Sequence, residues 1–305
     1  MKNWFRTIDI KVLLAFAAVY LIWGTTYLAI KIGLKHMEPF MMAGIRFLVA
    51  GFLLLLFSAF KREKLFDKNA LNQLLLGAFM LTLGQALLFW AEKYIPSGLA
   101  AVFTALLPIC YLITDTRNHR NYFTSKLTLF SIFLGLLGTV ILFKDELSAP
   151  SGQSATMRII ASIAAVGACL CWAAGSLYYK YYRSGGSLFK NVGWQLMGGM
   201  LVCFCISGFN GEWENFRLAE VPLGTWGIIV YLAIAGSIVA FSASYYLLTV
   251  RPAAVVGTYA YINPIIAVIL GYLVAGEAIT ICQISGIMII LSAAYFSNKV
   301  KFDLA

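Results

Sequence analysis

The sequence predicts an all-α integral membrane protein with ten transmembrane helices, arranged as two inverted five-helix repeats. Composition is the first observation behind this prediction: the 305 residues are 61% hydrophobic and only 12% charged, with a mean hydropathy of +0.83. Soluble domains carry about 25% charged residues. The second observation is a series of apolar runs long enough to cross about 30 Å of hydrocarbon. The third is that features of the first half of the chain return in the second half.

Ten apolar runs of about 20 residues are predicted to span the membrane. The first run follows Lys2, Arg6 and Lys11 as a signal peptide would, but it is too long and lacks a small-x-small cleavage site. We therefore expect it to be retained. The connecting segments are short, so we expect no attached soluble domain. The predicted spans cover residues 12–32, 39–60, 71–91, 97–115, 125–144, 156–179, 190–208, 223–248, 252–275 and 279–297.

An internal repeat links the two halves of the chain. Three pairs of residues are displaced by 149 positions, namely Trp23 and Trp172, Lys31 and Lys180, and Arg46 and Gln195. The stretch 96–102, which is followed by Pro108, returns at 252–258, which is followed by Pro264, at a displacement of 156. The displacement grows because one loop of the second half is longer.

These correspondences predict a first five-helix repeat over residues 1–148 and a second over residues 149–305. Because each repeat contains an odd number of helices, the second repeat lies in the opposite orientation across the membrane. Inverted repeats of this kind are common in secondary transporters. The sequence therefore favours a transport function before any single site is considered.

Cationic residues are distributed unevenly between the two sides of the membrane. Threading the ten spans places 16 of the 23 Lys and Arg residues on one side, and most acidic residues, including Glu212, Glu214 and Glu220, on the other. By the positive-inside rule, both termini are expected to be cytoplasmic, in a multi-pass protein of the cell inner (plasma) membrane. The net charge of +10 thus indicates topology, and we expect no nucleic-acid partner.

Cofactor and enzyme signatures are absent from the sequence. All six cysteines fall inside predicted spans, at spacings that match neither a metal tetrad nor a secreted disulfide framework. The two histidines, His36 and His119, lie in predicted loops on opposite sides. No nucleophile motif or Gly-rich phosphate loop occurs. We therefore predict no metal, no cofactor and no catalytic residues. The alternative left open is a membrane-embedded enzyme or assembly scaffold without transport.

Two stripes of larger side chains are candidate cavity walls. Trp23, Tyr27 and Lys31 recur every four residues and share one face of the first predicted helix. Trp172 and Ser176 share the equivalent face of the sixth helix, and Lys180 follows them. Either stripe can instead serve helix packing, with the lysine at the membrane interface. Their recurrence in both halves favours a role in lining a cavity.

Arg46 is a further candidate, because it lies seven residues beyond Pro39, about 10 Å along the second helix. A charged side chain in the membrane must pair, face water or reach the interface. It is expected either to bind loop carbonyls near a gate or to contact an anionic part of a substrate.

Two prolines are predicted inside helices, Pro108 in the fourth and Pro264 in the ninth, where each frees a backbone carbonyl. Polar groups near them, with Gln85 on the third helix, could bind a substrate at the midplane. These groups are Thr104, Tyr259, Tyr261 and Asn263.

One set of residues occurs in an order and spacing typical of a known family. The set is Trp23, Gly24, Lys31, Pro39 and Arg46 in the first half, and Asn263, Pro264, Gly271, Gly276, Glu277 and Gly286 in the second. Through them, nearly the whole chain resembles the EamA family of the drug/metabolite transporter superfamily. The resemblance implies an inner-membrane carrier that exports amino acids, other metabolites or toxic compounds.

Two departures from the family pattern limit what the resemblance implies. The first half has Asn121 or Tyr122 where Glu277 stands in the second half. The small multidrug relatives use a glutamate in their first helix, whereas this chain has no acid between Lys11 and Lys35. This difference argues against proton-driven cation export by that mechanism.

We therefore predict a secondary transporter that works by alternating access and exports a small metabolite, an amino acid-like compound or a drug. Its expected partners are a small-molecule substrate and the lipid bilayer, and a homodimer is left open. The predicted substrate-binding residues are Trp23, Tyr27, Lys31, Arg46, Gln85, Trp172, Ser176, Tyr259 and Asn263.

Overall fold

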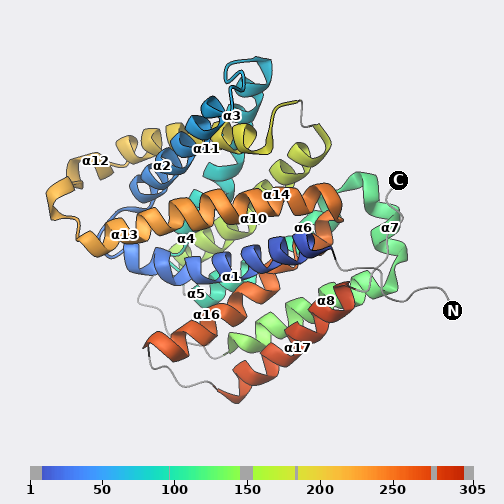
Figure 1. Cartoon of the computed structure of the whole chain (residues 1–305). Helices are drawn as coiled ribbons and strands as arrows, with labels where there is room; N and C mark the ends of the chain where they lie inside the picture. The colour runs from blue at the N-terminus through green and yellow to red at the C-terminus, as the bar shows by residue number, and fades with distance from the viewer. Residues whose placement is uncertain (1–8, 96, 145–153, 183–184, 276–279, 299–305) are drawn as a thin grey trace.

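Helices make up nearly the whole of the computed structural model (Figure 1). It describes residues 9–95, 97–144, 154–182, 185–275 and 280–298, and no strand occurs among them. The prediction of an all-α protein is confirmed. Gly276 and Glu277, which carried part of the family resemblance, lie outside the described residues.

Seven helices or continuous helical runs in the described part are long and apolar enough to cross a membrane. Two of the runs change to π-helix partway, η1 (Thr82–Ala86) between α3 and α4, and η4 (Leu232–Ala240) between α13 and α14. The seven are α1 (Ile10–Gly33), α2 (Pro39–Phe60), α3 to α4 (Lys68–Leu81 and Leu87–Ala91), α10 (Ala155–Tyr182), α11 (Leu188–Phe209), α13 to α14 (Leu223–Tyr231 and Phe241–Val250), and α15 to α16 (Ala253–Val256 and Tyr259–Ala275).

The other three predicted spans correspond to shorter apolar helices. They are α5 with α6 (Ser97–Thr104 and Leu107–Thr114), α8 (Lys126–Leu142), which meets the preceding segment that contains α7 (His119–Thr124) at 92°, and α17 (Ile281–Asn298). The prediction that Pro108 lies inside one long helix is wrong. The helix ends at Thr104, and Pro108 occupies the first turn of α6, where a missing N–H costs no helical hydrogen bond. Pro264 does lie inside α16, as predicted.

Helices α2 and α11 pack antiparallel through a contact that occurs twice. A Cβ added at Gly44 would lie 2.4 Å from the ring of Phe204, and one added at Gly193 would lie 3.0 Å from Leu55. Gly193 and Phe204 are the residues 149 positions beyond Gly44 and Leu55. The same pair of positions therefore meets in both directions, as occurs when two related surfaces face each other.

Helices α8 and α17 form a second antiparallel pair with the same property. A Cβ at Gly138 would lie 2.8 Å from Ile290, and a Cβ at Gly286 would lie 2.7 Å from the backbone of Leu142. Gly286 and Ile290 are 148 positions beyond Gly138 and Leu142. Glycine at these places lets the helix backbones approach closely, which is how apolar helices associate in lipid.

The first helix of each half packs on the other half of the chain. Helix α1 contacts α16 and the run from α13 to α14, whereas α10 contacts α6 and the run from α3 to α4. Figure 1 shows α1 lying between α14 and α16 in the middle of the bundle. The central space is consequently bordered by helices from both halves.

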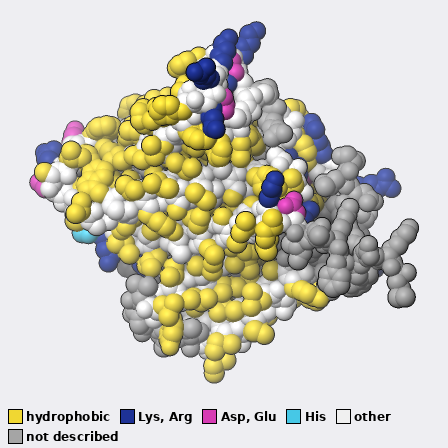
Figure 2. Space-filling view, in the orientation of Figure 1, with side chains coloured by type: hydrophobic (Ala, Val, Ile, Leu, Met, Phe, Trp, Pro, Cys, Tyr) yellow, Lys and Arg dark blue, Asp and Glu magenta, His cyan; other side chains and the backbone are white. Residues whose placement is uncertain are grey.

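Charged groups gather at the two ends of the bundle, and apolar side chains cover the face between them (Figure 2). At the end where α1 begins and α17 ends, the Lys190 ammonium lies 2.5 Å from Asp67 and lowers the pKa of that carboxyl. At the opposite end, Lys93 lies 2.5 Å from Glu38. We call the end with Lys190 and Asp67 the terminal end, and the end with Lys93 and Glu38 the loop end.

Candidate functional site

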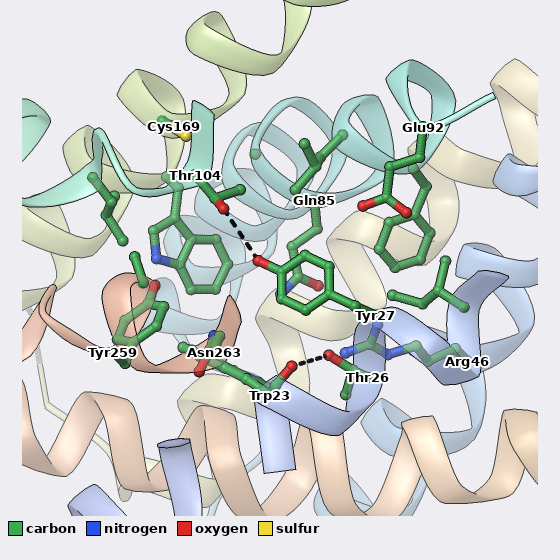
Figure 3. A pocket seen from close by; sticks show the side chains of 17 residues that line it. Trp23, Thr26, Tyr27, Arg46, Gln85, Glu92, Thr104, Cys169, Tyr259 and Asn263 are labelled. Atoms are coloured by element: carbon green, nitrogen blue, oxygen red, sulfur yellow. Dashed lines mark hydrogen bonds between the residues drawn. The ribbon is translucent and has the colours of Figure 1, made fainter. Parts of the chain in front are cut away.

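A cavity lies between α1, α2, η1 and α4, α10 and α16, with about 680 Å³ of empty space, its mouth included. Figure 3 shows aromatic side chains and a few polar groups converging on this space. It is lined by Trp23, Thr26, Tyr27, Ile30, Arg46, Gly84, Gln85, Leu88, Phe89, Glu92, Thr104, Leu107, Cys169, Trp172, Tyr259, Ala260 and Asn263.

Aromatic rings from three helices form one wall of the cavity. Trp23 of α1 packs edge-on against Trp172 of α10, with ring centroids 5.7 Å apart, and against Tyr259 of α16 at 4.7 Å. Its indole Nε1 donates a hydrogen bond to the carbonyl of Gly236 at 3.1 Å. Both tryptophans are only 6% exposed. A wall of packed aromatic rings suits an apolar or planar group.

Arg46 brings a buried positive charge to the cavity from α2. Its side chain is 3% exposed, and its Nε donates to Ser237 Oγ of η4 at 2.8 Å. The guanidinium also lies over the ring of Phe89, 5.8 Å from the centroid. A Cβ at Gly236 would come within 3.1 Å of Nη2, so glycine leaves room for the charged group.

The Arg46 guanidinium makes no ion pair with any described residue, since the two pairs in that part of the chain join other groups. Arg46 is thus held by a neutral hydroxyl on one side and an aromatic ring on the other. A guanidinium in such a place is suited to bind a carboxylate or a phosphate.

Gln85 and Glu92 bring polar acceptors to the same cavity. They are seven residues apart, about two helical turns, and share one face of the run that begins with α3. Within the described part of the chain, Gln85 Oε1 and Glu92 Oε1 are buried and accept no hydrogen bond. Leaving such an atom unsatisfied costs about 1 to 3 kcal/mol. These acceptors are therefore available to a bound molecule.

Glu92 is the first residue beyond the span Lys68–Ala91. Enclosure by the cavity walls raises the pKa of its carboxyl from 4.5 to about 8, although the Lys31 ammonium acts in the opposite direction. The carboxyl thus changes charge near neutral pH.

Packing toward the terminal end separates the cavity from that side. Tyr20 and Thr258 share a hydrogen bond of 3.1 Å between α1 and the segment before α16. Further on, the rings of Tyr179 and Tyr245 stack at 3.9 Å. No residue of these contacts lines the cavity, which extends instead toward Ile30 and Glu92 at the loop end.

Seven of the nine predicted binding residues line this one cavity, and two do not. Lys31 is exposed, one turn beyond Tyr27 on α1. Ser176 is buried, with its hydroxyl 3.8 Å from Met80 Sδ. The seven are Trp23, Tyr27, Arg46, Gln85, Trp172, Tyr259 and Asn263. Tyr27 also donates to Thr104 Oγ1 at 3.3 Å across the cavity, as Figure 3 shows.

Glu92 and Phe89 were not predicted from the sequence to line the cavity, although the sequence contains a signal for Glu92. An acid directly after a predicted span, on the same helical face as Gln85, could have been read as a cavity residue. Phe89 had no such signal, because one phenylalanine among many apolar residues is indistinguishable from a lipid-facing one. The described residues contain no cluster of three or more potential metal ligands.

The chain resembles known transporters over nearly its full length. It is 33% identical to "Uncharacterized inner membrane transporter YedA" of Escherichia coli over 296 residues, 94% of this chain and 90% of that one. It is 25% identical to "Probable amino-acid metabolite efflux pump" of Salmonella typhimurium, covering 92% of each chain. A protein known from a crystal structure has the same fold, with a TM-score of 0.74 at 18% identity, covering 94% of this chain and 97% of that one.

The family comparison agrees with the resemblance predicted from the sequence. The EamA-like transporter family matches residues 10–144 and, a second time, residues 159–299. The two matched segments cover both halves of the chain, including every helix that lines the cavity. The chain therefore belongs to the EamA-like transporter family, and it is a membrane transporter and not an enzyme.

Proposed function

We propose that the protein exports a small zwitterionic metabolite of the amino-acid type, with an apolar or aromatic side chain, and that the substrate binds in the cavity of Figure 3. The observation that carries the proposal is a buried guanidinium, Arg46, in the same aromatic-walled cavity as Glu92, whose buried Oε1 accepts no hydrogen bond from any described residue. One relative is named as an amino-acid metabolite efflux pump, which agrees with this class of substrate.

Each part of such a substrate has a complementary group in the cavity. The substrate carboxylate can take two hydrogen bonds from the free edge of the Arg46 guanidinium. The ammonium can donate to Glu92 and Gln85, which are the unsatisfied acceptors. The side chain then lies against Trp23 and Trp172, where apolar area leaves water.

The proposed mechanism is alternating access, in which two inverted five-helix repeats move so that the cavity opens to one side of the membrane and then to the other. The reciprocal glycine contacts of α2 with α11 and of α8 with α17 support it, because a local two-fold axis in the membrane plane generates such pairs. So does the exchange of partners between α1 and α10. In this conformation the terminal end is closed by packing, and the cavity extends to the loop end.

The counterpart of Arg46 in the second half is held by a neutral network. Gln195 donates to Gln73 Oε1 at 2.6 Å and accepts from the Tyr245 hydroxyl at 2.7 Å. The two halves thus offer different chemistry at equivalent places, with the charge at the loop-end cavity. We infer that the charged group of the substrate is bound there.

The terminal end is proposed to face the cytoplasm of a cell whose inner membrane holds the protein. The cation distribution supports this orientation. Export then means release at the loop end. A homodimer remains a prediction from the sequence alone.

Binding of amino acids to purified protein tests the proposed substrate. We would measure tryptophan fluorescence with a panel of L-amino acids, including L-phenylalanine and L-leucine, and with the matching amines and carboxylic acids that lack one charge. Trp23 and Trp172 are the expected reporters. A zwitterion should bind more tightly than either single-charge analogue.

Arg46→Gln should weaken that binding by about 10- to 150-fold, because a charge-assisted hydrogen bond contributes about 1.5 to 3 kcal/mol. Arg217→Gln, which changes an exposed arginine at the loop end, serves as the matched control and should bind as the wild type does. Equal binding by the Arg46 variant and the control would contradict the assignment of the cavity.

A further inference from the structure

Glu92 differs in its surroundings from two other carboxylates at the loop end, Glu38 and Glu212. Glu38 forms an ion pair with Lys93 at 2.5 Å, and Glu212 accepts a hydrogen bond from the backbone N–H of Met41 at 2.8 Å. The Glu92 Oε1, by contrast, is buried in the cavity wall and has no hydrogen-bond donor among the described residues. Figure 3 shows its carboxylate pointing into the cavity, beside the region of Tyr27 and Arg46.

The charged and titratable groups that share the cavity and its mouth with Glu92 come from four other helices. Helix α1 contributes Tyr27 to the cavity and Lys31 near its mouth, and α2 contributes Arg46. Helix α10 contributes the Cys169 thiol, and α16 contributes the Tyr259 hydroxyl. Two of these five groups, Lys31 and Arg46, are basic. Neither forms an ion pair with Glu92 within the described part of the chain.

The second half of the chain has no counterpart to this acid. The residue 156 positions beyond Glu92 is Leu248, which is fully buried in α14. If the two halves exchange access as proposed, an acid is present at the cavity when it is open to the loop end and absent from the equivalent place at the terminal end. The two halves therefore differ at this position, with a titratable acid in the first half and a leucine in the second.

We propose that Glu92 is a proton-binding site of the carrier, at which a proton from the loop-end side and the ammonium group of the substrate compete for the same carboxylate. This inference rests on the proposed function for the identity of the competing ligand. The proton site itself depends only on the enclosure of the carboxylate.

The competition would couple the entry of a proton to the export of the substrate. With Glu92 ionised, the cavity holds one negative and one positive group and is complementary to a zwitterion. A proton taken from water at the loop end neutralises the carboxylate, which leaves the ammonium without its charged acceptor and favours release of the substrate. The proton leaves Glu92 for water on the other side once the cavity opens there, so one proton enters for each substrate molecule exported.

Direct titration of the carboxylate tests the proton site without any substrate. We would record NMR spectra of purified protein labelled with ¹³C at the glutamate side-chain carboxyl, from pH 4 to 10. The signal lost in Glu92→Gln identifies the residue, and Glu38→Gln is the matched control at the same end. If the Gln variant does not fold, Glu92→Asp moves the signal and identifies it instead.

The expected midpoint of this titration is near 8, in agreement with the raised pKa of the enclosed carboxyl. A midpoint above 6.5 supports the proton site, and one below 6.5 overturns it. The midpoint can be measured whether or not any amino acid binds. A failure of the proton site can therefore be distinguished from a failure of the proposed function.

Competition is tested with the amino acid that binds best in the fluorescence assay. Its dissociation constant for the wild type should rise about tenfold for each pH unit below the midpoint, since one proton excludes one ligand. In Glu92→Gln the dissociation constant should be high and independent of pH. In Glu38→Gln it should change with pH as it does in the wild type. A pH-independent constant in the wild type would refute the competition.

Discussion

The crossing of α3 and α11 offers a sharp test of how the two halves pack. A Cβ at Gly77 would lie 1.9 Å from the carbonyl oxygen of Gln195, and a Cβ at Gly198 would lie 1.9 Å from the carbonyl oxygen of Leu74. Both obstacles are backbone atoms, so no side-chain rotation can relieve the clash. Gly77→Ala must therefore push the helices apart by more than about 1 Å to restore an ordinary contact.

The expected cost of Gly77→Ala is about 2 to 4 kcal/mol of folding free energy. Overpacking a close contact costs about 1 to 3 kcal/mol. Separation of the helices also stretches the buried bond between Gln73 and Gln195, now 2.6 Å, which contributes about 1 kcal/mol. Gly167→Ala in α10 is the matched control, because a Cβ there meets nothing within 4 Å. It should be neutral or stabilise by up to about 1 kcal/mol.

Both variants would be purified in the same detergent, and the fraction that stays monodisperse after heating would be followed by size-exclusion chromatography. We expect Gly77→Ala to lose monodisperse protein at a clearly lower temperature than Gly167→Ala. Equal heat resistance of the two variants would refute the close crossing of α3 and α11.

Three further predictions follow from the cavity and from the charges. Trp23→Ala and Trp172→Ala should each cost about 3 to 5 kcal/mol of stability and should reduce transport further than they reduce folded protein; an equal loss of both would make these residues purely structural. As the pH rises from about 4.5 to 8, the wild type should lose up to about 1.4 kcal/mol of stability per pH unit relative to Glu92→Gln, because folded protein keeps a proton on Glu92 that the unfolded chain has released. Heat denaturation of both proteins across this pH range measures the difference. No difference between them would mean that the carboxyl is solvated. Reporter fusions at Ala305 and near Glu214 should report the cytoplasm and the opposite side, and an external C-terminus would overturn the inverted arrangement.

Much of the helical order could be predicted from the sequence, because hydropathy over about 20 residues is a local property. The recurrence of Trp23 as Trp172 also predicted that both line a cavity, and in the structure their rings meet in one. The break before Pro108 could not be predicted. Whether a proline sits in the interior or in the first turn of a helix depends on how neighbouring helices satisfy the freed backbone groups, and Pro264 of the second half does lie inside its helix.

The limits of prediction at the site have a similar cause. A four-residue period places Trp23, Tyr27 and Lys31 on one face, but it does not say where along that face the cavity ends. In the structure the cavity ends near Ile30, and Lys31 is exposed. Ser176 shares a face with Trp172 and is nevertheless sealed off, since the terminal end of the bundle is closed in this conformation.

The most direct test of the central claim is flux through purified protein in liposomes. Vesicles loaded with the amino acid that binds best would be diluted into buffer containing a trace of the radiolabelled compound, and uptake by exchange would be normalised to monodisperse protein. We expect saturable exchange by the wild type and by Arg217→Gln, and a loss of about tenfold or more for Arg46→Gln at subsaturating concentration. Wild-type vesicles that exchange no member of the panel, or an Arg46 variant that exchanges at the wild-type rate, would contradict it.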